Sequence, residues 1–163
     1  MLRFLGNEKG FDFKPNAVIL FSPPSFGNAG QLAGDLILST MNRRKRLTYV
    51  GSIESVLLLP TSGYESLNSS SSLGTKLILP IEVYEIANDS SSPIYIIQQR
   101  SQCVKGAIEL FYNQFKSFLA SIHVLLLIVL TGGGTEDMEL GEYRNFSLQN
   151  EVAKALIPTL YPR

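Results

Sequence analysis

The chain has 163 residues, of which 45% are hydrophobic, and its 14 basic and 14 acidic side chains give a formal net charge of zero. A balanced charge provides no global field that would attract nucleic acid or an acidic membrane surface, so the sequence disfavours both as main partners. A chain of this length can bury a core of its own, and no shift in composition marks a boundary. We therefore expect a single domain over residues 1–163.

Cysteine content and apolar segments indicate the compartment. Cys103 is the only cysteine, which excludes an intrachain disulfide and a thiolate metal cluster built from this chain alone. Arg3, Glu8 and Lys9 stand among scattered apolar residues, without the continuous apolar stretch of a signal peptide. The longest apolar run, residues 124–130, is far shorter than the roughly 20 residues of a membrane-spanning helix. The sequence thus favours a reducing compartment over secretion.

The first predicted elements are a strand, a tight turn and a helix. The apolar run at residues 16–21 predicts a buried strand, and Pro23 and Pro24 end it. Small and apolar side chains then recur at helical spacing: Ala29, Leu32, Ala33, Leu36, Ile37 and Thr40. This stripe predicts an amphipathic helix, and Gln31 and Asp35 lie off its apolar side.

The turn before this helix invites comparison with phosphate-binding loops, because glycines let the backbone approach an anion at a helix N-terminus. The segment Gly27-Asn28-Ala29-Gly30 lacks the Gly-x-Gly-x-x-Gly spacing of a dinucleotide site, and no Lys-Ser or Lys-Thr pair follows as a P-loop requires. We therefore interpret Gly27 and Gly30 as structural residues of the turn.

The middle of the chain predicts β-structure. Residues 47–50 and 56–59 are strand candidates, and a Pro-Thr-Ser-Gly segment ends the second. Residues 66–72 are mostly serine and asparagine, which predicts a mobile loop. Residues 77–86 and 94–99 are rich in β-branched and aromatic side chains and flank a turn-forming segment. These last two runs predict an antiparallel hairpin.

The last third predicts a helix, a strand and a second helix. Apolar side chains recur at helical spacing over residues 104–122. The unbroken apolar run at 124–130 indicates a central parallel strand covered on both faces. Ser147 is a plausible N-cap for a helix over residues 148–157, which Pro158 would end. The sum is an α/β fold, a three-layer α/β/α domain with a mixed, mostly parallel sheet.

Few side chains suggest chemistry. His123 is the only histidine and has no evident nucleophile to activate, and Cys103 has no evident base, so both favour structural roles. Residues 131–135, Thr-Gly-Gly-Gly-Thr, follow the predicted central strand where α/β folds place ligands. The acidic side chains that follow are typical of a solvated loop, with a metal or polar ligand site as the alternative: Glu136, Asp137, Glu139 and Glu142.

A basic run follows the first predicted helix: Arg43, Arg44, Lys45 and Arg46. Cations interact favourably with the negative end of a helix dipole, which favours a solvated helix end. A surface for an acidic partner or for nuclear import is the alternative.

Three segments together resemble one known family. The pattern Ser-x-Gly-Asn-x-Gly-Gln-Leu-Ala-x-Asp-Leu-Ile over residues 25–37 follows a short apolar strand, Glu-Val-Tyr stands at 82–84, and Ile-Gln-Gln-Arg stands at 97–100. The combination is similar to the proteasome assembly chaperone 2 family. The resemblance is dense over about residues 15–100 and thin beyond.

This resemblance implies a non-enzymatic chaperone without cofactor or metal. It implies that the chain forms a heterodimer with a related chaperone subunit, contacts proteasome α-subunits, assists assembly of the 20S α-ring, and occurs in the cytoplasm and nucleus. The candidate partner-binding residues are Asn28, Gln31, Asp35, Arg43, Arg44, Arg46 and Tyr161.

The C-terminal region departs from the family pattern. Family members end in a hydrophobic-tyrosine-any tail that inserts between α-subunits, whereas here Tyr161 is third from the end and Pro162 follows it. The chain also looks short, lacking the family's C-terminal part. A truncated form and a diverged member that leaves ring docking to its partner both remain open. Either predicts exposed apolar sheet edges that favour a partner chain.

An enzyme is the alternative function. The architecture is similar to that of nucleoside phosphorylases or hydrolases, which would require a polar constellation around residues 132–134 and Asn28. A single histidine, no convincing nucleophile and no basic phosphate clamp argue against this interpretation. An orphan structural domain is a third hypothesis.

Overall fold

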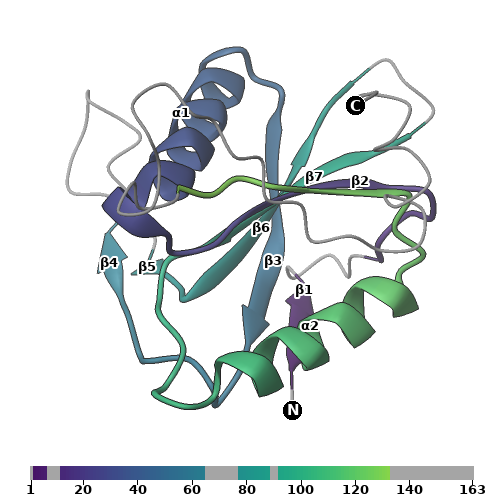
Figure 1. Cartoon of the computed structure of the whole chain (residues 1–163). Helices are drawn as coiled ribbons and strands as arrows, with labels where there is room; N and C mark the ends of the chain where they lie inside the picture. Colours follow the sequence, from purple (N-terminus) through teal and green to yellow (C-terminus); the bar gives the residue numbers. More distant parts are fainter. Residues whose placement is uncertain (1, 7–11, 65–76, 89–91, 133–163) are drawn as a thin grey trace, which may run out of the picture.

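The structure, a computed structural model, describes residues 2–6, 12–64, 77–88 and 92–132. Eight strands are present in these ranges: β1 (Arg3–Gly6), β2 (Val18–Ser22), β3 (Leu47–Glu54), β4 (Gly63–Tyr64), β5 (Leu77–Ile78), β6 (Ile81–Ile86), β7 (Ile94–Gln99) and β8 (Leu126–Val129). Six of them form one sheet in the order β1-β3-β6-β7-β2-β8, and β4 pairs with β5 separately. The sheet runs between two long helices, α1 (Ala29–Arg43) and α2 (Ile108–Ser121) (Figure 1).

The sheet is mixed, as predicted. Strand β2 is parallel to both neighbours, with Val18 opposite Ile94 of β7 and opposite Leu126 of β8. The pairs β1–β3, β3–β6 and β6–β7 are antiparallel, which confirms the hairpin for residues 81–86 and 94–99. The start of the first predicted arm, Leu77–Ile78, is instead β5, which pairs with β4. The expectation of a mostly parallel sheet is wrong for the described strands. One reason is that residues 87–93, between β6 and β7, are too few for the crossover of a dozen or more residues that parallel neighbours need.

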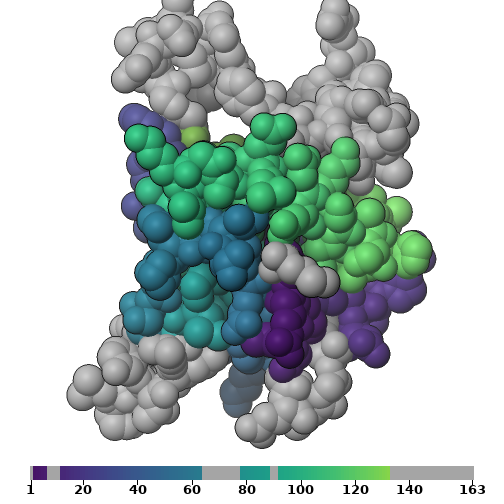
Figure 2. All heavy atoms as spheres, turned by 90° about the horizontal axis from the view of Figure 1, so that it is seen from below, coloured from purple at the N-terminus to yellow at the C-terminus, as the bar shows by residue number. Residues whose placement is uncertain are grey.

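Two cores, one on each face of the sheet, confirm the three layers. Along β7, Tyr95 and Ile97 belong to the core under α2, whereas Ile96 belongs to the core under α1. This alternation follows from the two-residue period of a strand. Helix α2 buries Phe111, Phe115 and Leu119. Seen from below, α2 in green lies against the blue of β3 and the dark purple of β1 (Figure 2).

Two strand predictions need correction. Residues 56–59 form a turn whose only ladder contact is an isolated bridge between Leu58 and Cys103, and Val56 is 82% exposed. The predicted central strand at 124–130 is the shorter β8, which lies at the edge of the described sheet with Leu125 and Ile128 exposed. The unbroken apolar run therefore did not indicate a central strand. Apolar side chains show that the faces of a strand can be covered, but they do not show whether other strands pair with both of its edges.

Several expectations concern residues that the structure does not describe. The loop at 66–72, the acidic segment that follows Gly132 and the helix over 148–157 all lie outside the described ranges. The helices within those ranges include none with the length and apolar character to cross a membrane.

Candidate protein-binding surface

Helix α1 begins in a turn of unusual backbone conformation. Gly27 has φ +61° and Asn28 has φ +55°, both in the left-handed region that most side chains avoid. The amide of Gly30 donates to Ser25 Oγ at 3.1 Å, which satisfies one of the amides that a helix start leaves without an intrahelical partner. Asn28 makes no side-chain capping bond. The left-handed backbone of Gly27 and Asn28, together with the Ser25 hydroxyl, therefore sets where α1 starts.

Glycines bring this turn against the end of β8. A methyl group on Gly30 would overlap the carbonyl of Leu130, so the helix backbone touches the backbone that leaves the strand. A methyl group on Gly132 would lie 2.6 Å from the carbonyl oxygen of Phe26 and 2.8 Å from Ala29 Cβ. The ends of β2 and β8 are where open α/β sheets bind ligands. Here the start of α1 occupies that position.

Hydrogen bonds fix the same end of α1 to β2 and β7. Ser22 Oγ donates to the carbonyl oxygen of Gly30 at 2.7 Å. Gln31 Nε2 donates to the carbonyl oxygen of Gln99 at 3.1 Å, and Gln98 Nε2 donates to the carbonyl oxygen of Gln31 at 3.3 Å. The Gln31 side chain thus points toward the end of β7 and serves to hold the helix on the sheet.

Asp35 takes part in an ion-pair chain one turn further along. Asp35 Oδ1 accepts a hydrogen bond from Arg100 Nη2 at 2.7 Å. Arg100 Nε in turn lies 4.0 Å from Glu82 Oε2, and Glu82 is only 1% exposed. Tyr84 also donates to Glu82 Oε2, at 3.1 Å. Burial by itself would lower the pKa of Arg100, because it disfavours the charged guanidinium. The hydrogen bonds to Asp35 and the negative charges of Asp35 and Glu82 favour the charged form more strongly, so the pKa of Arg100 is raised.

The sequence-predicted partner residues therefore divide into groups. Gln31 and Asp35 are bonded to β7 and to Arg100 within the chain, although the Asp35 side chain remains 44% exposed. Asn28 is exposed in the turn. The basic run is exposed at the C-terminal end of α1, beginning with the last helical residue: Arg43, Arg44, Lys45 and Arg46. Tyr161 lies outside the described residues.

The largest departure from the sequence analysis is the face that α1 buries. The buried residues are Gly30, Gly34 and Leu38, whereas the predicted apolar stripe exposes 63% of Leu32 and 69% of Leu36. A methyl group on Gly34 would overlap the Gln98 side chain and lie 2.9 Å from Ser22 Oγ. The two glycines four residues apart were the missed signal, because they allow the helix to lie close on the sheet.

Phe26 adds a third exposed apolar side chain in the 3-10 turn Phe26–Asn28 before the helix, with 67% of its surface accessible. Large apolar side chains exposed together on one element mark binding surfaces more often than isolated ones do. The solvent side of α1 therefore carries Leu32 and Leu36 of the predicted stripe, whereas Ile37 of the same stripe packs against the core under α1, as predicted.

The residues of possible chemical interest do not form a catalytic group. His123, Ser121 and Asp12 line one cavity of about 470 Å³, but Ser121 Oγ donates to the carbonyl oxygen of Phe118, and no hydrogen bond joins the three side chains. Burial raises the pKa of the Cys103 thiol, which lowers its reactivity. Over the described ranges, no three His, Cys, Asp or Glu side chains gather closely enough to hold a metal ion.

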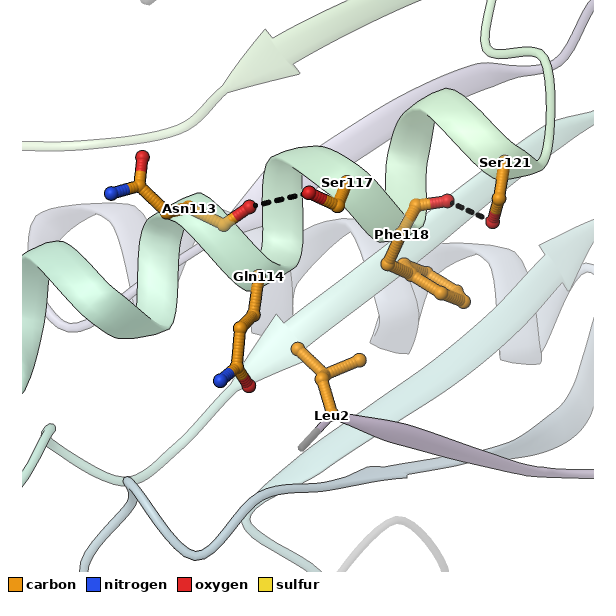
Figure 3. Close-up of a pocket in the computed structure, with 6 residues that line it drawn as sticks. All are labelled: Leu2, Asn113, Gln114, Ser117, Phe118 and Ser121. Carbon is orange, nitrogen blue, oxygen red and sulfur yellow. Dashed lines mark hydrogen bonds between the residues drawn. The ribbon is translucent and has the colours of Figure 1, made fainter.

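A larger hollow of about 630 Å³ lies on the same side of the sheet, between α2 and Leu2 before β1, and Phe118 and Ser121 line both cavities. Leu2 points toward α2, and Gln114 and Phe118 extend toward it, whereas Asn113 points away (Figure 3). Ser117 Oγ donates to the carbonyl oxygen of Asn113, so this hydroxyl is already used within the helix. None of the described residues that line this hollow is charged, so they offer a ligand few polar groups.

Comparison with known proteins gives a family. The sequence model of the PAC2 family matches residues 21–156, which include the α1 turn, both helices and the strands from β3 to β8. This match agrees with the resemblance noted from the sequence. The sequence matches no curated protein.

Solved structures share the fold at low sequence identity. Pyrococcus furiosus PbaA, described as an archaeal homolog of proteasome-assembly chaperone, aligns with TM-score 0.55 and 12% identity over 79% of this chain and 47% of its own. P. furiosus PbaB, described as an archaeal proteasome activator, aligns with TM-score 0.53 and 10% identity over 78% of this chain and 50% of its own. A Thermoplasma acidophilum protein of unknown function aligns with TM-score 0.53 and 18% identity over 71% of this chain and 42% of its own. The chain thus spans half or less of each, and the likeness shows the fold alone.

Proposed function

The chain belongs to the PAC2 family, and from this membership we propose that it acts as a chaperone subunit in the assembly of the proteasome. The family match over residues 21–156 is the observation that carries the proposal. The fold supports it, because PbaA, a homolog of proteasome-assembly chaperone by its description, has a similar one. In finer detail, the chain pairs with a related chaperone subunit and assists formation of the 20S α-ring in the cytoplasm and nucleus.

The proposed mechanism is protein binding without a catalytic step. The α1 face supports it, since intrachain bonds from Gln31 and Asp35 hold the helix in place while Leu32 and Leu36 face solvent. A helix that is fixed before binding loses little conformational entropy when a partner docks. The basic run after α1 supplies a charged border to this surface, and Tyr161 is a candidate contact with α-subunits.

The alternative of a nucleoside phosphorylase or hydrolase finds little support in the geometry. It requires polar side chains around Asn28 and Gly132, at the ends of the parallel strands. There the backbone of Gly132 packs against Phe26 and Ala29 instead. We therefore carry only the chaperone function forward.

Affinity purification of the tagged full chain from its own cells, followed by mass spectrometry, tests the proposal. We expect a related chaperone subunit and proteasome α-subunits, with few mature β-subunits. The Val56→Glu variant is a matched control, because Val56 is 82% exposed and lies in the turn after β3 rather than on α1. If a folded, soluble chain recovers neither α-subunits nor a related chaperone, the proposed function is wrong.

A further inference from the structure

The solvent face of α1 has the residue spacing of a helix-pairing seam. The residues that lie opposite its buried face are separated by three, four, three and four positions: Ala29, Leu32, Leu36, Ser39 and Arg43. This is the spacing of a and d positions in a coiled coil, where each side chain packs into a hole on a facing helix. We call these five residues the α1 seam.

No seam residue belongs to the two buried cores of the described residues, although Ala29 packs against Gly132. Glycines and Leu38 on the opposite side of α1 already pack against the sheet, and an amphipathic surface helix normally places charged or polar residues on its solvent face. Here the middle of that face carries Leu32 and Leu36 at 63% and 69% exposure. A helix apolar on its solvent side and already anchored on its other side presents a site for a second helix.

The charge along the seam is polarised. Its C-terminal end is Arg43, which Arg44 and Lys45 follow, all three exposed, and none of the three forms an ion pair with any other described residue. The nearest acidic side chain of α1, Asp35, is neutralised by Arg100 at 2.7 Å. A partner that lies along the seam therefore meets leucines at its middle and, at one end, positive charge that no described acidic side chain pairs with.

We propose that the α1 seam docks an amphipathic helix of a partner protein. That helix places apolar side chains at spacings of three and four on Leu32 and Leu36, and acidic side chains beside the Arg43–Lys45 end. The proposal rests on the proposed function only in taking the partner to be a protein, and it adds the surface and the chemistry of recognition. Helix-in-groove recognition of this kind is read through anchors one helical turn apart.

Binding of two designed peptides to the full chain tests the seam. Both peptides are helical with leucine at the a and d positions, and they differ only in three residues at one end, glutamates in the first and lysines in the second. Fluorescence anisotropy at low salt measures each affinity. We expect the glutamate peptide to bind about tenfold or more tightly than the lysine peptide, with the difference reduced at high salt because screening weakens exposed charges.

Variants separate the apolar and the charged parts of the site. Leu36→Glu is expected to weaken the glutamate peptide at least about tenfold by placing a carboxylate in the seam, whereas Val56→Glu changes its affinity less than about twofold. Reversing the charge of Arg43 and Arg44 to glutamate should exchange the preference in favour of the lysine peptide. Circular dichroism checks that each variant is folded, and Leu32→Ser replaces Leu36→Glu should the latter not fold.

Several results would overturn the proposal. The recognition argument fails if both peptides bind with equal affinity or if neither binds the folded chain. It also fails if Val56→Glu weakens binding as much as Leu36→Glu does. A dimer of the chain in sedimentation that Leu36→Glu dissociates makes a second copy the occupant, and binding to phosphatidylserine vesicles without peptide binding makes it a membrane surface. Undiminished recovery of both the related chaperone subunit and the α-subunits by a Leu36→Glu chain would refute the seam as the partner site while leaving the proposed function intact.

Discussion

Two leucines of α1, two positions apart, provide a stringent test of which side of the helix is buried. Leu38 is 2% exposed and packs in the core with Tyr84, Ile86 and Ile96, whereas Leu36 is 69% exposed. We expect Leu38→Ala to lower the free energy of unfolding by about 3 kcal/mol. The same substitution at Leu36 should change it by less than about 0.5 kcal/mol.

The magnitudes follow from the burial of each side chain. Complete burial of a leucine contributes about 2 kcal/mol by transfer from water, and Leu38 forfeits most of this when truncated. The cavity left between α1 and the sheet adds to the loss, because packed surroundings collapse only in part. Leu36 has about a third of its surface covered, so it forfeits roughly 0.6 kcal/mol. Alanine's higher helix propensity returns a few tenths of a kcal/mol.

Urea denaturation of the full chain, followed by circular dichroism, measures both variants against the parent protein. Equal slopes of free energy against urea would show that each variant unfolds from a comparably compact state. A loss at Leu36 as large as that at Leu38 would refute the reasoning. It would mean that the predicted apolar stripe is buried after all, and the seam proposal would fail with it.

Three further predictions concern stability. Gly30→Ala should destabilise the fold by about 2 kcal/mol, because the new methyl group meets the backbone after β8, whereas Gly34→Ala should cost less because its methyl group meets side-chain atoms. Thermal melts compare the two variants, and a stabilised Gly30→Ala would contradict the close contact. Arg100→Met should cost about 3 kcal/mol, because it leaves the buried carboxylate of Glu82 without its cation. Asp35→Asn should cost less than about 1 kcal/mol, because Asp35 is the exposed partner of Arg100. Urea midpoints in the reverse order would refute the network. Because burial raises the pKa of Cys103 above its ordinary 9.0, the unfolded thiol ionises first and stability should fall as pH rises through about 9; a Cys103→Ala variant with an unchanged slope between about pH 8 and 10 would refute this.

Local patterns in the sequence were enough to predict most elements. Residues 94–99 with 77–86 predicted the hairpin of β6 and β7, because β-branched runs around a short turn can satisfy their hydrogen bonds with each other. The helical spacing over 104–122 predicted α2, since its phenylalanines fall on one face. The motif at 25–37 gave the family resemblance, which the match over residues 21–156 confirms.

Sheet position and pairing depended on contacts between distant segments. The run at 56–59 has strand composition but only one isolated bridge, at Leu58. The apolar run of β8 fits a central strand, yet the described sheet ends with it. Composition records how apolar a strand is, whereas its neighbours are chosen by the arrangement of the whole sheet. The sequence therefore could not distinguish an edge strand from a central one.

The sequence by itself determined that a helix with an apolar stripe over residues 29–40 follows a glycine-containing turn, and that Gln31 and Asp35 lie on a different side from Leu32 and Leu36. Only the tertiary structure decided which side is buried. Gly30 and Gly34 contribute nothing to a hydrophobic stripe, but their lack of a side chain lets the helix backbone reach the sheet. Asp35 finds Arg100 sixty-five residues away, and that long-range ion pair, with the close glycine contact, leaves the leucines facing solvent.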